Sequence, residues 1–123
     1  MTIDTNVLID FLSGDDRVVH VVRRWREEGV SLFVSTIVET EFLGFSKMVG
    51  ETRRSAEQFL EENFISVSFD RPIARIAAGI RQDAKIKFPD AAIAATALFT
   101  HTPIVTRNVK DFRRVFGLQI ISL

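Results

Sequence analysis

The fold is decided by the stretch MTIDTNVLID, residues 1–10. A very short apolar segment leads to an acid at position 4, and an apolar helical pattern follows at once over residues 6–12. In an open α/β sheet, ligands bind at the carboxyl ends of the strands. The sequence therefore predicts a first strand that delivers Asp4 to the functional edge of such a sheet. An Asp followed by Thr5 and Asn6 is also a common helix start, so a purely structural capping role for Asp4 stays open.

Apolar periodicity along the chain indicates further strands and helices in alternation. We expect strands at 31–34, 64–69, 103–106 and 117–121. We expect helices at 6–12, 16–28, 37–49, 51–62, 71–85, 89–99 and 108–115, with Gly50 stopping the helix at 37–49. Such alternation implies parallel strands joined by crossover connections. The prediction is one α/β/α three-layer domain over residues 1–123, with a central parallel sheet.

Composition limits the class of protein. The chain has 123 residues, of which 46% are hydrophobic and 26% charged, as in one soluble globular domain. No apolar run approaches the ~18 residues that cross a membrane, and no secretion signal is visible. Cysteine is absent, which excludes disulfides and thiolate metal sites and suits a reducing cytoplasm. With only His20 and His101 present, a zinc site built on histidine is not expected.

Charge is balanced overall but unevenly distributed. Residues 1–70 hold 7 Lys and Arg against 13 Asp and Glu, and residues 71–123 hold 9 against 3. The two parts therefore carry −6 (7 − 13) and +6 (9 − 3). Such asymmetry can mark a surface that faces a polyanion, although solvated faces that happen to segregate explain it equally well.

Asp4 needs a partner if it does chemistry, and the helix expected at 37–49 offers Glu39 or Glu41. At ~100° per residue, one arc of this helix collects the apolar residues Ile37, Val38, Phe42, Phe45, Met48 and Val49. Glu41 lies inside this arc and Glu39 outside it. An acid in an apolar stripe is costly unless it is paired or bound to a cation. We therefore predict Glu41 as the second acid, the alternative being that it sits at the edge of the stripe and reaches water.

Asp90 and Asn108 complete the candidate set. Asp90 lies in FPDAAIAATA, residues 88–97, where Pro and Asp suit a helix start. Alanine at nearly every position of that helix permits close packing, as in a central helix with Asp90 at the sheet's functional edge. Asn108 follows the strand that ends at Thr106. It is also a possible helix cap, with Asp111 three residues later in a capping-box-like position.

These three acids and one amide all fall at or just beyond the carboxyl ends of predicted strands. Carboxylates that are packed together repel one another, and their pKa values rise unless a cation is present. Oxygen ligands without Cys or His select a hard ion such as Mg²⁺ or Mn²⁺. Such an ion on an acidic site commonly serves phosphoryl chemistry, because it polarises the phosphate and activates water.

Four segments together resemble the PIN-domain nucleases, and most of all the VapC-type toxins of bacterial and archaeal toxin–antitoxin pairs. They are DTNVLID (4–10), STIVETEF (35–42), PDAAIAATA (89–97) and VTRNVKDF (105–112). The resemblance spans nearly the whole chain, in order and at typical spacing. It implies a five-stranded parallel sheet and an Mg²⁺- or Mn²⁺-dependent endoribonuclease that acts on RNA. It also implies a homodimer and inhibition by a cognate antitoxin.

The resemblance also assigns roles to residues. Asp4, Glu41 and Asp90 match the three principal acids and metal ligands of the family. Asn108 matches a fourth catalytic position that is often Asp, which weakens the case for a second metal ion, and Asp111 is a possible substitute there. The polar positions that usually orient the acids are matched by Asn6, Ser35 and Thr106. Two departures are the short first strand and residues 82–87, which replace a stretch that often carries Gly.

Basic residues next to Asn108 are candidates for binding RNA phosphates. They are Arg107, Lys110, Arg113 and Arg114, and a solvated basic helix explains them equally well. The 11 Phe fall mostly on apolar stripes, so no aromatic platform for unpaired bases is expected.

Three other functions compete with a toxin nuclease. One is a non-catalytic binding module on a PIN fold, and another is a PIN nuclease that acts in RNA processing. A phosphatase-like phosphotransfer enzyme is disfavoured, because Asn6 stands where such enzymes usually need a second Asp.

Overall fold

A five-stranded sheet, in which all strands are parallel, organises the computed structural model, which describes all 123 residues. The strands are β1 (Thr2–Ile3), β2 (Phe33–Ser35), β3 (Ile65–Val67), β4 (Ile104–Thr106) and β5 (Ile120–Ser122). Their spatial order is β3-β2-β1-β4-β5, so the two-residue β1 occupies the centre. Thr2 pairs with Phe33 on one side and with Ile104 on the other. The predicted parallel α/β architecture is confirmed.

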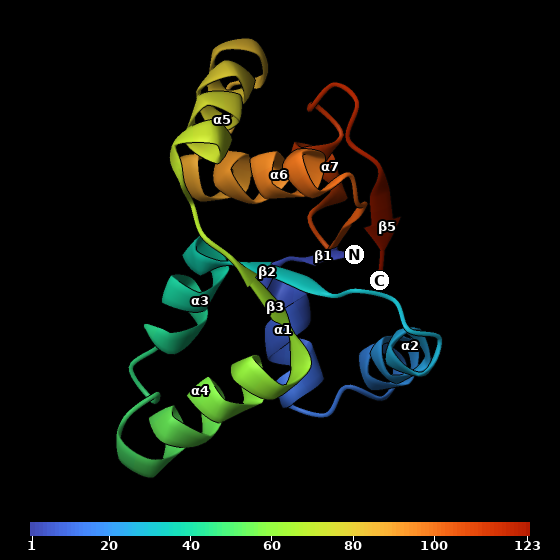
Figure 1. Ribbon diagram of the computed structural model, residues 1–123, viewed down its shortest axis with the longest axis vertical. Helices are drawn as coiled ribbons and strands as arrows, with labels where there is room; N and C mark the ends of the chain where they lie inside the picture. Colours follow the sequence, from blue (N-terminus) through green and yellow to red (C-terminus); the bar gives the residue numbers. More distant parts are fainter.

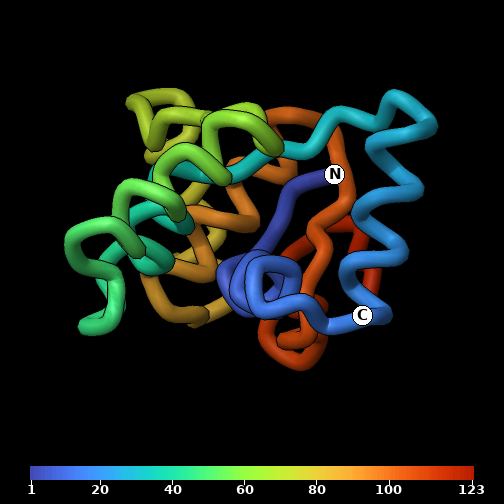
Figure 2. Tube along the Cα trace, turned by 90° about the horizontal axis from the view of Figure 1, so that it is seen from below, coloured from blue at the N-terminus to red at the C-terminus, as the bar shows by residue number.

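Helices cover both faces of this sheet, giving the three layers that the sequence predicts. They are α1 (Thr5–Leu12), α2 (Asp16–Glu27), α3 (Thr36–Leu43), α4 (Gly50–Asn63), α5 (Arg71–Ala84), α6 (Phe88–Thr100) and α7 (Val109–Phe112). In Figure 1, α5 and α6 lie on one side of the sheet, and α1, α2 and α4 lie on the other. Figure 2 shows the start of the chain running beside the segment that carries β4. No helix combines the length and the hydropathy needed to span a lipid bilayer.

The alanine-rich helix α6 lies at the centre of the packing. All seven residues from Ala91 to Ala97 are buried, and α6 contacts α3, α5, α7, β1, β2 and β4. Small side chains allow this close approach on every face, because a larger residue would need space that the neighbouring elements occupy. This tight packing fixes where the first turn of α6, and therefore Asp90, sits relative to the sheet.

The predicted helix at 37–49 was wrong at its C-terminal end. α3 ends at Leu43, and Gly50 begins α4 instead of ending α3. Gly44 donates its backbone N–H to the Thr40 carbonyl at 3.0 Å, and a Cβ at position 44 would lie only 2.8 Å from that oxygen. Phe45 and Val49, whose spacing extended the predicted helix, are 48% and 67% exposed. The apolar periodicity therefore continues beyond the turn at Gly44 that ends α3, and it predicted a helix that is too long.

Two other features differ from the sequence pattern. The last strand occupies Ile120–Ser122 instead of 117–121, because Gly117, at φ +79°, still belongs to the preceding turn. Lys85 ends α5 in the left-handed conformation, at φ +52° and ψ +43°, where glycine is the usual residue. This position falls in the stretch 82–87, where relatives of the family often carry Gly. In this chain Lys85 adopts a left-handed conformation that glycine adopts more easily.

Candidate active site

Asp4 lies between the end of β1 and the start of α1, and its carboxylate accepts hydrogen bonds from two sides. Its Oδ1 accepts the backbone N–H of Thr5 at 2.8 Å, and its Oδ2 accepts the hydroxyl of Thr106 at 2.6 Å. Asp4 is only 5% exposed. Burial raises the pKa of Asp4 and the charge of Glu41 adds to the rise, while the two hydrogen bonds oppose it. Asp4 therefore caps α1, and it also forms part of a buried polar network that reaches β4.

This network continues from Thr106 to Asn108. The Thr106 hydroxyl accepts the backbone N–H of Asn108 at 2.9 Å. The Asn108 side-chain amide donates to Asp111 Oδ2 at 3.1 Å and, at the long distance of 3.5 Å, to Asp90 Oδ2. The side chain of Asn108 makes no capping hydrogen bond to α7. Asn108 therefore holds Asp111 and faces Asp90, which is consistent with a site residue and excludes the simple capping role.

Asp90 stands in the first turn of α6 and is half-buried. Its pKa is raised to about 6. Burial is the largest cause, followed by the negative charges of Asp4, Asp111 and Glu41, and Lys87 opposes them. The sheet and α6 thus bring carboxylates close enough together to raise the pKa values of Asp4 and Asp90.

Glu41 reaches the same region from α3, but not as a buried acid. Its side chain is exposed, and its Oε1 accepts the hydroxyl of Thr5 at 2.8 Å. The expectation that Glu41 lies in a buried apolar stripe was wrong, because α3 ends before Phe45, Met48 and Val49. Glu39 lines a separate groove with Arg53. The structure therefore places Glu41, and not Glu39, beside the Asp4–Thr5 segment.

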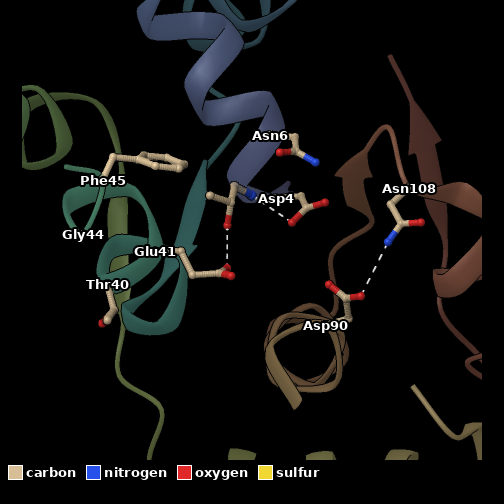
Figure 3. A pocket seen from close by; sticks show the side chains of 9 residues that line it. Asp4, Asn6, Thr40, Glu41, Gly44, Phe45, Asp90 and Asn108 are labelled. Atoms are coloured by element: carbon tan, nitrogen blue, oxygen red, sulfur yellow. Dashed lines mark hydrogen bonds between the residues drawn. The ribbon is translucent and has the colours of Figure 1, made fainter. Parts of the chain in front are cut away.

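These side chains line one cavity of about 490 Å³, here called the acidic pocket. It is lined by Asp4, Thr5, Asn6, Thr40, Glu41, Gly44, Phe45, Asp90 and Asn108. Figure 3 shows the α3 residues on one side, Asp90 and Asn108 on the other, and Asp4 between them. Four predicted site residues from four separate segments thus meet at the carboxyl ends of β1, β2 and β4.

Other predicted residues lie in different surroundings. Ser35 is buried and caps α3, its Oγ accepting the backbone N–H of Ile37 at 3.1 Å, and it has no hydrogen bond to any of the acids. Arg107 forms ion pairs with Asp10 at 3.0 Å and with Asp15 at 3.4 Å.

Lys110, Arg113 and Arg114 are exposed and form no ion pairs. Of the predicted supporting residues, Asn6 lines the acidic pocket, Thr106 holds Asp4, and Asp111 is reached through Asn108.

Sequence reasoning missed four residues that line the pocket: Thr5, Thr40, Gly44 and Phe45. Thr5 had a usable signal, since a hydroxyl next to a functional acid is well placed to orient a second one. Gly44 had one as well, because a glycine directly after an amphipathic run indicates a helix end. With the helix ended there, Phe45 no longer belongs to the apolar stripe.

The donor set of the pocket fits a hard divalent cation. Its side-chain ligand atoms are carboxylate, hydroxyl and amide oxygens, with no sulfur or imidazole nitrogen, and none of the carboxylates of Asp4, Glu41 and Asp90 forms an ion pair. No three Asp, Glu, His or Cys side chains in the chain are close enough to enclose a metal ion as they stand. This arrangement suits Mg²⁺, which is usually held by one or two carboxylates and keeps several waters.

Thr106→Val is expected to destabilise the fold by about 1–3 kcal/mol, although the two side chains have nearly the same shape. The change removes a donor from buried Asp4 and an acceptor from the Asn108 N–H. Thr96→Val is the matched control, because Thr96 is equally buried but donates only to the Ala92 carbonyl within α6. Urea unfolding of both variants measures the difference, and equal losses would contradict the role given to the Thr106 hydroxyl.

Known proteins match this chain over almost its whole length. The PIN domain family model matches residues 1–117. Ribonuclease VapC1 of Rickettsia felis is 29% identical over 133 residues, covering 100% of this chain and 96% of that protein.

Solved structures agree with the fold described above. A toxin–antitoxin complex from Klebsiella pneumoniae contains a chain that is 29% identical, with a TM-score of 0.79 and coverage of 98% of this chain and 94% of that one. VapBC2 from Rickettsia felis, bound to a DNA fragment from its promoter, has a TM-score of 0.84 with 99% and 97% coverage. At 18% identity, this second likeness concerns the fold alone. Because the family model covers almost the entire chain, the protein belongs to the PIN domain family.

Proposed function

We propose that the protein is an Mg²⁺- or Mn²⁺-dependent endoribonuclease that hydrolyses RNA phosphodiester bonds and serves as the toxin of a toxin–antitoxin pair. The observation that carries the proposal is the acidic pocket, where the carboxylates of Asp4, Glu41 and Asp90 gather without an ion-pair partner and the pKa of Asp90 rises to about 6. Such a site is short of positive charge, and a divalent cation supplies it. The name of the Rickettsia felis relative, a ribonuclease, supports the choice of reaction.

Four residues of the acidic pocket have proposed roles in binding the metal ion. Asp4 and Asp90 would hold the metal ion directly, and Glu41 and Asn108 would hold it through water. When bound, the ion supplies Lewis-acid polarisation of the phosphate and a lower pKa for water. Thr106 and the Thr5 N–H fix the Asp4 carboxylate, and the Thr5 hydroxyl holds Glu41.

Basic residues near the pocket are proposed to bind the flanking phosphates. Lys110, Arg113 and Arg114 are exposed and follow Asn108 along the chain. Arg107 is already engaged by Asp10 and Asp15, so it is assigned to holding α1, the start of α2 and the end of β4 together. Exposed Lys and Arg without partners are available to neutralise phosphates at little cost.

The proposed partners follow from the relatives. The Klebsiella pneumoniae chain was solved within a toxin–antitoxin complex, and we extend an antitoxin partner to this protein. A homodimer and a cytoplasmic location belong to the same proposal. A small upstream reading frame that encodes a DNA-binding protein with a disordered tail would favour a toxin over a nuclease of RNA processing.

The unsubstituted protein is expected to cleave single-stranded RNA in Mn²⁺ or Mg²⁺ and to lose this activity in EDTA. Metal at about 100 times its Kd stabilises the fold by ~2.7 kcal/mol, which corresponds to a rise in Tm of roughly 5–15 °C. Gel analysis of labelled RNA and a thermal melt with added Mn²⁺ measure the two effects.

Asp4→Asn tests the assignment of the site, and Asp83→Asn, at an exposed position on α5, is the control. We expect the first to lose cleavage and the metal-dependent rise in Tm, and the second to keep both. A protein that cleaves no RNA with Mn²⁺ and shows no metal-dependent rise in Tm would instead be a binding module on a PIN fold.

A further inference from the structure

Phe45 is the single apolar side chain among the nine residues that line the acidic pocket. It is 48% exposed, and it has no aromatic partner in the protein. Figure 3 shows its ring on the Glu41 side of the pocket, across from Asp90 and Asn108. The core therefore gives no reason for a large aromatic residue at this position.

The backbone at Phe45 is held by the turn that ends α3. Gly44 brings the chain so close to the Thr40 carbonyl that a Cβ there would lie 2.8 Å from the oxygen. The next turn is closed by the Met48 N–H, which donates to the Phe45 carbonyl at 2.9 Å. The backbone of Phe45 is thus held on both sides, and its side chain is presented at the pocket.

From this geometry we propose that Phe45 is the stacking platform for an unpaired base next to the scissile phosphate. This inference rests on the proposed ribonuclease function and deepens it by naming the side chain that binds a base of the single-stranded substrate. In the proposed function the acidic side chains of the pocket bind the cation that contacts the phosphate, and they provide no flat apolar surface on which a base could stack. Phe45 offers a flat apolar surface at the same cavity, and bases stack on aromatic rings without sequence preference. A base inside a duplex has no free face, so the platform selects against double strands.

The stacking contact predicts a distinctive kinetic change. Phe45→Ala is expected to lose roughly 5- to 100-fold in affinity for single-stranded RNA, seen as a higher KM with kcat little changed. Its Tm stays near that of the unsubstituted protein, because the ring is about half exposed and has no aromatic partner. Phe45→Trp retains the affinity, whereas Phe45→Leu, which keeps an apolar side chain without a ring, does not.

Phe99→Ala is the matched control. Phe99 is 46% exposed, close to the exposure of Phe45, but it lies at the end of α6 opposite Asp90. The same substitution there removes the same amount of exposed aromatic surface away from the acidic pocket. We expect no change in KM for this variant.

A binding measurement separates stacking from catalysis. Each Phe45 variant is combined with Asp90→Asn and mixed with single-stranded RNA that carries 2-aminopurine at successive positions. Fluorescence quenching at one position, retained with Trp and lost with Ala and Leu, is the expected result. Equal quenching for Phe, Leu and Ala overturns the inference, as does a change of oligomeric state in Phe45→Ala without any change in RNA affinity.

The same experiments distinguish the failure of this inference from the failure of the proposed function. Metal-dependent cleavage with a KM that does not depend on the aromatic ring at position 45 overturns the stacking role and leaves the nuclease in place. If the unsubstituted protein cleaves no RNA, the proposed function fails and this inference fails with it.

Discussion

Asp90→Asn is expected to reduce RNA cleavage by roughly 10²–10⁴-fold while raising the Tm of the metal-free protein at pH 7.5. The loss follows because an amide is a poor substitute for a carboxylate that binds a hard cation. The gain follows because Asp90 is forced to ionise beside Asp4, Glu41 and Asp111 in a half-buried position. The helix dipole of α6 favours the ionised carboxylate of Asp90 and therefore reduces this gain in Tm. The gain remains, because the pKa of Asp90 is raised on balance. Most inactivating changes destabilise a protein, so the opposite sign is diagnostic.

The pH dependence supplies the check on this explanation. The pKa of Asp90 is raised from 3.8 to about 6, so the folded protein holds this proton more tightly than the unfolded chain does. The resulting stability is present below about pH 4 and is lost as the pH rises to about 6. The Tm difference between Asp90→Asn and the unsubstituted protein should therefore be small near pH 4, grow to pH 6 and then level off. Asp83→Asn, at an exposed site, should show no such trend, and a constant difference for Asp90→Asn would point to packing instead of charge.

Saturating Mn²⁺ should reverse the order of stability. The metal ion relieves the repulsion in the unsubstituted protein, whereas the Asp90→Asn pocket lacks one of the proposed direct ligands. The unsubstituted protein then becomes the more stable of the two. This reversal requires metal binding at the pocket itself, so it also tests whether two direct carboxylates are enough in a site where no three acidic side chains are preassembled.

The parts of this site that sequence alone predicted are those with a local signal. Asp4 follows a strand and precedes a helix, and Asp90 follows a proline at the start of an alanine-rich helix. Parallel strands end at one edge of a sheet, so both acids were expected at the same place, and the structure brings them to one cavity. Neither inference needed contacts between distant segments.

The surroundings of Glu41, Ser35 and Arg107 were not predicted, because they depend on such contacts or on the residue at which a helix ends. Glu41 was chosen by a periodicity that continued through Gly44, and the real helix stops there, which leaves Glu41 exposed. Ser35 follows a strand just as Asp4 does, but its hydroxyl is used by the backbone of its own helix. Arg107 is next to a site residue, yet two acids 92 or more residues away engage it. The role of each of these side chains is decided by the group that it contacts in the folded protein, and the local sequence pattern does not identify that group.

Ala94→Leu is expected to destabilise the fold and to lower activity, although position 94 does not line the acidic pocket. Ala94 is fully buried in α6, which packs on α5 and on three strands of the sheet, so the added carbons have no space. Overpacking of this kind costs about 1–3 kcal/mol, or a fall in Tm of roughly 5–15 °C for a domain of this size. Since α6 also carries Asp90, any shift that accommodates Leu should lower cleavage as well, and misplacement by ~1 Å can cost about a hundredfold.

Ala78→Leu is the matched control, because it adds the same atoms to an exposed position of the neighbouring helix α5. It should change stability by no more than ~0.5 kcal/mol and leave cleavage unchanged. The comparison decides whether the alanines of α6 are a packing requirement or only a helix-favouring composition. If Ala94→Leu is as stable and as active as Ala78→Leu, close packing of α6 does not position Asp90, and the acid must be held by its polar contact with Asn108 alone.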